Sequence, residues 1–144
     1  MGPGCLVSPC GKQFTPALSA ADSYEMLLKL AKNGIGASFY DPVSDTMFDA
    51  NPIDILIGQM EATKQLATAG KLYAFDYLTY IGLAATEKDL HRGWAVECLY
   101  EIGEEILNFD NIYTTDKVYY MRPSRLPCDG FESCFDSDEY CTDL

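Results

Sequence analysis

The feature that most constrains the fold of this chain is a pair of segments with helical periodicity, each with a start signal at one end and a glycine at the other. The first follows Ser19, a good N-cap residue, and Asp22 three residues later completes a partial capping box. Its apolar residues recur at i, i+3, i+4 and i+7 and are Tyr24, Leu27, Leu28 and Ala31. Asn33 and Gly34 provide the stop, because glycine tolerates a left-handed backbone. We therefore predict a helix that starts at Ser19 and ends at Asn33.

The second periodic segment starts at Asn51, a capping residue. Pro52 follows at a position where a helix needs no N–H donor. Asp54 favours the same end through the helix dipole, and Gly70 ends the segment. The residues expected on its buried face are Ile53, Leu56, Ile57, Met60 and Ala67. We predict a second helix between Asn51 and Gly70.

Two short segments between or after these helices favour β-hairpins. Ser38–Tyr40 and Thr46–Phe48 flank the turn-forming sequence DPVSD, and this pattern is typical of a hairpin. A second small hairpin is predicted within residues 112–121, and it could pair with the first.

The remaining segments favour helices. The aromatic residues of 71–85 suit a strand, but its length and Ala-rich end favour a buried helix. Thr86, with Asp89 three residues later, is expected to start a further helix that runs to about Asn108.

These elements predict an α+β fold that is mainly helical, with about four helices and one or two short β-hairpins. We expect an irregular N-terminal lead-in at residues 1–18, one compact domain at 19–125, and an acidic cysteine-containing tail at 126–144. A chain of 144 residues suits one domain of this kind.

The charge of the chain limits its partners. The sequence has 22 Asp and Glu residues against 10 Lys and Arg residues, a formal net charge of -12. Phosphate backbones and anionic membranes attract Lys and Arg, so we expect neither direct nucleic-acid binding nor membrane binding. A basic protein surface is the natural partner, although acidity that only keeps the protein soluble is an equally simple interpretation.

Catalytic motifs are missing from the sequence. It has no G-x-S-x-G, no P-loop and no G-x-G-x-x-G sequence, and its single histidine, His91, is too few for a carboxylate-bridged di-iron site. We therefore assign no catalytic residue, no metal ligand and no cofactor. The N-terminus lacks the basic and apolar regions of a secretory signal, which predicts a cytoplasmic protein with reduced thiols.

A cluster of carboxylates on the helix predicted to start at Thr86 is the first candidate binding site. At about 100° per residue, its four glutamates fall within one arc of a helix. Trp94 at the edge of this arc could anchor an interface, or it could turn into the core. The cluster consists of Glu97, Glu101, Glu104 and Glu105. Like charges at this spacing repel, so either a partner or a plain solvated face accounts for them.

The tail is the second candidate site. Residues 126–144 contain six acids and no base. Their three cysteines have the spacing C-x5-C-x6-C, which lacks the short knuckle of a structural zinc site. A metal clip and a disulfide to Cys5 or Cys10 remain alternatives, but a mobile acidic tail is favoured. Its candidate partner-binding residues are Asp136, Asp138 and Glu139.

The sequence thus favours a non-enzymatic acidic binding protein that occupies a basic surface of another protein. The most specific version of this hypothesis is a nucleic-acid mimic that inhibits a DNA- or RNA-handling machine, as small phage-type inhibitors do. One alternative is a structural or assembly protein whose acidity only gives solubility. Another is a metal-binding protein that uses the terminal cysteines. The sequence does not predict the oligomeric state.

Overall fold

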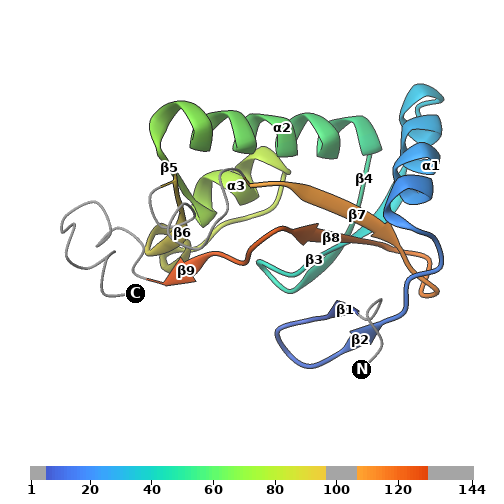
Figure 1. The fold of residues 1–144 in the computed structure, drawn as a ribbon, viewed down its shortest axis with the longest axis horizontal. Coiled ribbons are helices and arrows are strands. Elements are labelled where there is room, and N and C mark those ends of the chain that lie inside the picture. Colours follow the sequence, from blue (N-terminus) through green and yellow to red (C-terminus); the bar gives the residue numbers. More distant parts are fainter. Residues whose placement is uncertain (1–5, 97–106, 130–144) are drawn as a thin grey trace. The chain divides into compact units, whose positions relative to one another are not determined.

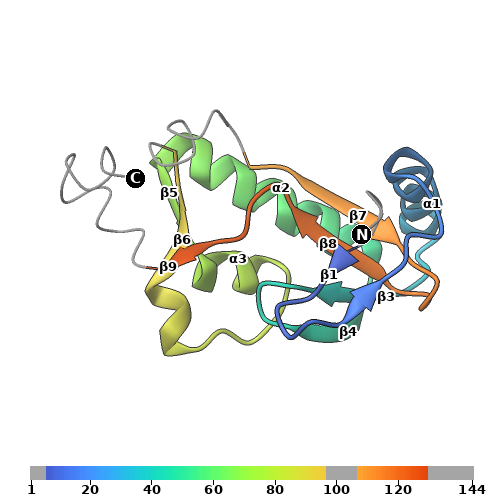
Figure 2. The ribbon, with the colours of Figure 1, turned by 60° about the horizontal axis from the view of Figure 1, so that its bottom comes forward.

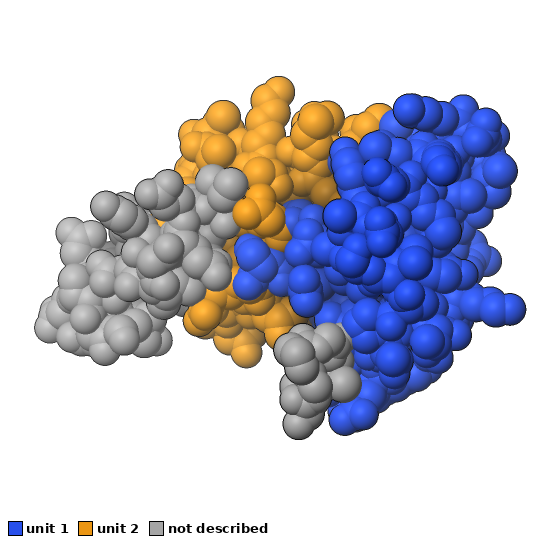
Figure 3. All heavy atoms as spheres, turned by 45° about the vertical axis from the view of Figure 1, so that its right-hand side comes forward, with its two compact units in different colours: residues 1–56, 109–124 blue, residues 57–108, 125–144 orange. Residues whose placement is uncertain are grey.

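The computed structural model of the chain describes residues 6–96 and 107–129. The chain divides into two compact units, shown in different colours in Figure 3. Unit 1 comprises residues 1–56 and 109–124, and unit 2 comprises residues 57–108 and 125–144.

Unit 1 is built on a four-stranded mixed sheet (Figure 1). Its strands, in spatial order, are β4 (Thr46–Ala50), β3 (Ala37–Asp41), β8 (Tyr119–Pro123) and β7 (Phe109–Tyr113). β3 and β8 are parallel, whereas both outer pairs are antiparallel hairpins. The two hairpins predicted from the sequence are therefore confirmed, and the central parallel pair joins them into one sheet.

One face of this sheet carries a row of four aromatic rings, one from each strand. Neighbouring ring centroids are 5.8, 5.6 and 5.0 Å apart. The row consists of Phe48, Phe39, Tyr119 and Tyr113. Because side chains alternate between the faces of a strand, the residues that follow Phe39 and Tyr119 point to the opposite face.

That opposite face is covered by a small hairpin made of β1 (Leu6–Val7) and β2 (Gln13–Phe14) (Figure 2). The Phe14 ring lies 4.8 Å from that of Tyr40 and 5.4 Å from that of Tyr120. The Tyr120 hydroxyl donates a hydrogen bond of 2.8 Å to the Val7 carbonyl. Part of the segment predicted to be an irregular lead-in therefore pairs as strands and completes the core of unit 1.

The first predicted helix is confirmed as α1 (Ala20–Lys32). The Ser19 hydroxyl accepts a hydrogen bond from the Asp22 N–H at 3.0 Å, and Gly34 beyond the helix has a φ of 65°. Ser23 and Leu27 form its buried side. The Ser23 hydroxyl also accepts the Tyr113 N–H at 2.9 Å, which ties α1 to the edge strand β7.

The second predicted helix is confirmed as α2 (Pro52–Ala69), whose first residues belong to unit 1 and whose remainder belongs to unit 2. Unit 2 also has an antiparallel sheet of three short strands. They are, in spatial order, β5 (Lys71–Tyr73), β6 (Arg92–Ala95) and β9 (Cys128–Asp129). α3 (Ala74–Tyr80) and the 3-10 helix η1 (Glu87–Leu90) lie between β5 and β6 in sequence. Leu66, Leu72, Tyr77, Leu78 and Trp94 are buried in unit 2.

The prediction of a mainly helical fold with about four helices is wrong. Three α-helices lie wholly within the described residues, together with nine strands in three sheets, so the fold is α+β with a large share of sheet. The difference arises in the two segments that were expected to be single helices. Residues 71–73 and 92–95 are instead paired strands, because each supplies the hydrogen-bonding partner that the other needs.

The predicted buried face of α2 is also wrong. Ile53, Ile57 and Met60 are 42%, 46% and 60% exposed, and the buried side chains include Ile55, Gln59, Ala62 and Leu66. The helix has apolar residues on most of its sides, so more than one apolar stripe has helical spacing. The packing of unit 2 buries the stripe that runs through Ala62 and Leu66.

Candidate interaction surfaces

Seven of the eight predicted partner-binding residues lie outside the described residues. They are Glu97, Glu101, Glu104, Glu105, Asp136, Asp138 and Glu139. The eighth, Trp94, lies on strand β6 in the core of unit 2 and is 2% exposed. Its indole N–H donates to the Arg125 carbonyl at 2.7 Å, and its ring meets Tyr77 edge-on at 5.7 Å. Because it is buried and hydrogen-bonded, Trp94 is a core residue of unit 2.

The charges divide unevenly along the chain. The described residues hold all ten Lys and Arg residues and thirteen of the 22 acids. Residues 97–106 and 130–144 therefore hold nine acids and no base. The excess negative charge of the protein is concentrated in these two segments, which also contain the seven carboxylates predicted to bind a partner.

Several charges of the described part form ion pairs with neighbours. Lys12 lies 3.5 Å from Asp116, and Arg122 lies 3.1 Å from Asp110, with all four side chains about half exposed. Exposed pairs of this kind contribute little to stability, but they bring the local charge close to zero. The described surface therefore mixes both signs of charge.

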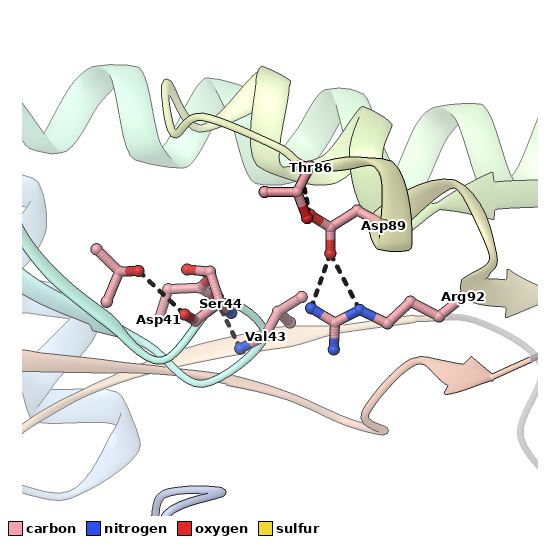
Figure 4. A network of polar contacts seen from close by, with 7 residues as sticks. Asp41, Val43, Ser44, Thr86, Asp89 and Arg92 are labelled. Atoms are coloured by element: carbon pink, nitrogen blue, oxygen red, sulfur yellow. Dashed lines mark hydrogen bonds and ion pairs between the residues drawn. The ribbon is translucent and has the colours of Figure 1, made fainter.

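Asp89 is a buried acid whose hydrogen bonds are satisfied within unit 2. Its carboxylate accepts the Thr86 N–H at 2.8 Å and the Arg92 guanidinium at 2.9 and 3.1 Å (Figure 4). Burial raises the pKa of Asp89, but the hydrogen bonds from Thr86 and the charge of Arg92 outweigh it and hold the pKa below its ordinary value. The group caps η1 and positions the start of β6, which is a structural role.

Asp41 has a corresponding role in unit 1. It is fully buried at the end of β3, and its carboxylate accepts hydrogen bonds from the Val43 N–H, the Ser44 N–H and the Ser44 hydroxyl at 3.3, 3.0 and 2.7 Å (Figure 4). These bonds form the turn of the first hairpin, in which the sequence DPVSD had predicted a turn.

A polar cluster at Asp45 joins the β1–β2 hairpin to the β3–β4 hairpin of unit 1. The Asp45 carboxylate accepts the Tyr40 hydroxyl at 2.7 Å and the Cys10 thiol at 3.7 Å, and Cys10 also lies 3.1 Å from the Ser8 hydroxyl. Burial, followed by the hydrogen bond to Asp45, raises the pKa of Tyr40 far above its ordinary value. The thiol lies beside a carboxylate rather than a cationic group of the kind that activates a cysteine nucleophile. The cluster therefore fastens one hairpin to the other.

The other features of the described residues provide little for chemistry. Residues 6–96 and 107–129 contain no group of three or more side chains able to hold a metal ion. None of the helices in this part of the chain is long and apolar enough to span a membrane. An open hollow of about 480 Å³ at the end of the β3–β4 hairpin is lined by Gly36, Ala37, Ser38, Asp49 and Ala50.

The exposed side of α2 is a surface that the sequence analysis missed. The sequence pattern predicts Ile57 and Met60 as an apolar row, but it places them in the core.

Comparison of the chain with protein-family models, with curated proteins and with solved structures finds no match.

Proposed function

We propose that this protein is a non-enzymatic binding protein that occupies a basic surface of another protein. The observation that supports the proposal is the separation of charge along the chain. Ten bases and thirteen acids share the described residues, whereas nine acids without a base lie in residues 97–106 and 130–144. Segments of one sign create the strong local potential that attracts a basic partner.

The described acids that are held by hydrogen bonds to turns or to a neighbouring hairpin have structural roles, which supports binding rather than catalysis. Asp41 and Asp89 are buried and hold backbone turns, and Asp45 joins two hairpins. A catalytic acid or base needs a position from which it can exchange a proton with a substrate. In a nucleic-acid mimic, by contrast, carboxylates only have to present charge to a basic groove.

The test is capture of partners from a lysate of the source organism on the immobilised protein, read by mass spectrometry, followed by affinity measurements with each purified partner. One variant carries Gln at Glu97, Glu101, Glu104 and Glu105. A second carries Asp136→Asn, Asp138→Asn and Glu139→Gln. We expect wild-type affinity to fall steeply as salt rises, because exposed charges are screened over about 8 Å at physiological ionic strength. Each variant should bind more weakly than wild type.

The matched control for the tail variant removes three charges from exposed positions of the described part: Glu25→Gln, Asp54→Asn and Glu87→Gln. It has the same change in net charge, so a general effect of charge would weaken both variants equally. Equal weakening, or affinity that does not depend on salt, would contradict the proposal. Self-association that persists in all variants, with no basic partner captured, would favour the assembly protein.

A further inference from the structure

We infer that the outer edge of strand β4 in unit 1 is a docking site for an extended segment of the partner protein that carries a lysine or arginine. The site, called here the β4 edge, consists of β4 (Thr46–Ala50) and the hollow beside it. The inference rests on the proposed function, because it identifies the kind of segment through which a basic partner would bind. This segment would join the four-stranded sheet as a further strand.

The two edges of the sheet differ in what covers them. At one edge, the Ala17 N–H donates to the Tyr113 carbonyl of β7 at 2.8 Å, and the Tyr113 N–H donates to the Ser23 hydroxyl of α1 at 2.9 Å. At the other edge, within the described part of the chain, β4 pairs only with β3 and makes no further backbone hydrogen bond. Because alternate residues of an edge strand point their N–H and C=O groups away from the neighbouring strand, β4 leaves such groups open to another strand.

β4 lacks the features that commonly keep an edge strand from pairing. Such strands are often protected by lysine, by proline or by a bulge. The sequence of β4, TMFDA, contains neither lysine nor proline, and its five residues pair with β3 in unbroken register. A regular edge of this length is sufficient for pairing with another strand.

Asp49 gives the β4 edge a negative charge beside an open space. The Ser38 hydroxyl donates to Asp49 Oδ1 at 2.5 Å, whereas Oδ2 has no hydrogen-bond partner among the described residues. The hollow of about 480 Å³ lies against this exposed side chain, and none of the residues that line it is basic. The bond from a neutral hydroxyl leaves the charge of the carboxylate in place, so Asp49 can pair with a lysine or arginine that enters the hollow.

The alternation of side chains along β4 specifies the order of residues in the segment. Met47, which is 49% exposed, and Asp49 point to one face of the sheet, and Phe48 points to the other. Residues directly opposite each other on neighbouring strands have their side chains on the same face. An antiparallel segment would therefore carry a basic residue beside Asp49, then a β-branched or aromatic residue beside Phe48, then an apolar residue beside Met47.

Charge distinguishes this segment from a second copy of the chain. The β4 strand of a second copy has no base to place beside Asp49, and two molecules of formal net charge -12 repel each other. A basic segment has the charge complementary to Asp49. In strand addition the main-chain hydrogen bonds provide affinity, and the side chains at alternate positions provide specificity.

The first experiment measures binding of a synthetic peptide of about ten residues, with Lys-Val-Leu at its centre and threonine and serine around it. One control peptide has glutamate in place of the lysine, and it should bind more weakly. Two further peptides are methylated on alternate backbone nitrogens, in complementary frames. Because an added strand directs only alternate N–H groups at its neighbour, one of these two should bind about tenfold or more weakly and the other as the parent does.

Hydrogen exchange measured by NMR locates the peptide on the wild-type protein. Binding of the lysine peptide should slow the exchange of alternate backbone amides in β4. The amides of β7 (Phe109–Tyr113), the other edge strand, should be unaffected.

Variants then test the charge. Asp49→Asn should weaken binding of the lysine peptide by about twofold to fivefold, as expected for an exposed charge pair. Asp49→Lys should weaken it by about tenfold or more, because it places a like charge beside the peptide lysine. Asp110→Asn on β7 is the matched control, an exposed acid on the other edge strand, and should leave affinity unchanged.

Several results would overturn the inference. They are absence of lysine-peptide binding, equal binding of the glutamate peptide, undiminished binding of both methylated peptides, unchanged exchange of the β4 amides, and affinity that Asp49→Lys leaves unchanged. Protection of the β4 amides that grows with protein concentration in the absence of peptide would also overturn it, by identifying a second copy as the occupant.

Partner capture separates a failure of this inference from a failure of the proposed function. If capture depends on the acids of residues 97–106 and 130–144 but not on Asp49, only this inference fails. If Asp49→Lys abolishes capture and the acid-to-amide variants do not affect it, the β4 edge is retained and the proposed function fails.

Discussion

At the scale of the residue, buried polar groups show which side chains have a structural role. Asp89 and Tyr119 are both almost fully buried, but their surroundings differ. Asp89 receives hydrogen bonds from Thr86 and Arg92, whereas the Tyr119 hydroxyl has no hydrogen-bond partner among the described residues. The two groups therefore predict mutational effects of opposite sign.

Asp89→Asn should lower the free energy of unfolding at pH 7 by about 1–3 kcal/mol, because a buried charge-assisted network loses its anion. The folded-state pKa of Asp89 is lowered, so its contribution is complete above the ordinary Asp pKa of about 3.9 and is lost as the pH falls through the folded-state value. The difference between wild type and variant should shrink below about pH 4. Denaturant unfolding at several pH values measures this difference in the free energy of unfolding.

Asp110→Asn is the control. Because Asp110 belongs to an exposed ion pair, the substitution should change the free energy of unfolding by less than about 0.5 kcal/mol.

Tyr119→Phe should raise the free energy of unfolding by about 1 kcal/mol, because it removes a buried hydroxyl that was desolvated without a partner. Burial also raises the pKa of Tyr119 to about 12, so the hydroxyl is neutral at physiological pH. Tyr120→Phe is the paired test: it loses the bond to the Val7 carbonyl and should lower stability by about 1 kcal/mol. A loss of stability in Tyr119→Phe equal to that in Tyr120→Phe would show that the Tyr119 hydroxyl has a partner.

At the scale of the element, the close approach of α3 limits which residue can occupy position 58 of α2. Gly58→Ala should destabilise the protein by roughly 1–3 kcal/mol through overpacking against the Tyr80 carbonyl, although alanine is intrinsically better in a helix by about 1 kcal/mol. Gly36→Ala is the control, because its Cβ would lie at an ordinary 3.7 Å from the Ala50 oxygen. Thermal unfolding compares the two. A Gly58→Ala protein more stable than wild type would mean that α2 and α3 are not packed this closely.

Local signals predicted the elements whose stabilising groups are close in sequence. Ser19 caps α1 from three residues away, and Asp41 forms the turn beside it. The strand β6 has no such signal, because its hydrogen-bonding partners are β5, about twenty residues earlier, and β9, more than thirty residues later. Its sequence could be read as part of a helix until those partners were known.

At the scale of the whole molecule, the acidic excess should oppose the compact state. Raising the salt concentration screens repulsion among the 22 acids and should raise the melting temperature, by roughly 2–4 °C for each kcal/mol of stabilisation. Thermal unfolding in sodium chloride at neutral pH measures the change. A melting temperature that falls with salt would show that ion pairs such as Lys12–Asp116 outweigh the repulsion.

The sequence by itself determined the ends of α1 and α2, the two hairpin turns and the uneven distribution of charge, since each depends on residues that are close in sequence or on a sum over residues. Tertiary structure decided which side of α2 is buried, that Trp94 lies in a core, and that residues 71–73 and 92–95 are strands. These outcomes depend on groups distant in sequence. An apolar side chain is buried, and a backbone N–H is hydrogen-bonded, only by the groups that lie next to it in the folded protein. The apolar row of Ile57 and Met60 was visible in the sequence, but only the packing of the opposite side of α2 left it exposed.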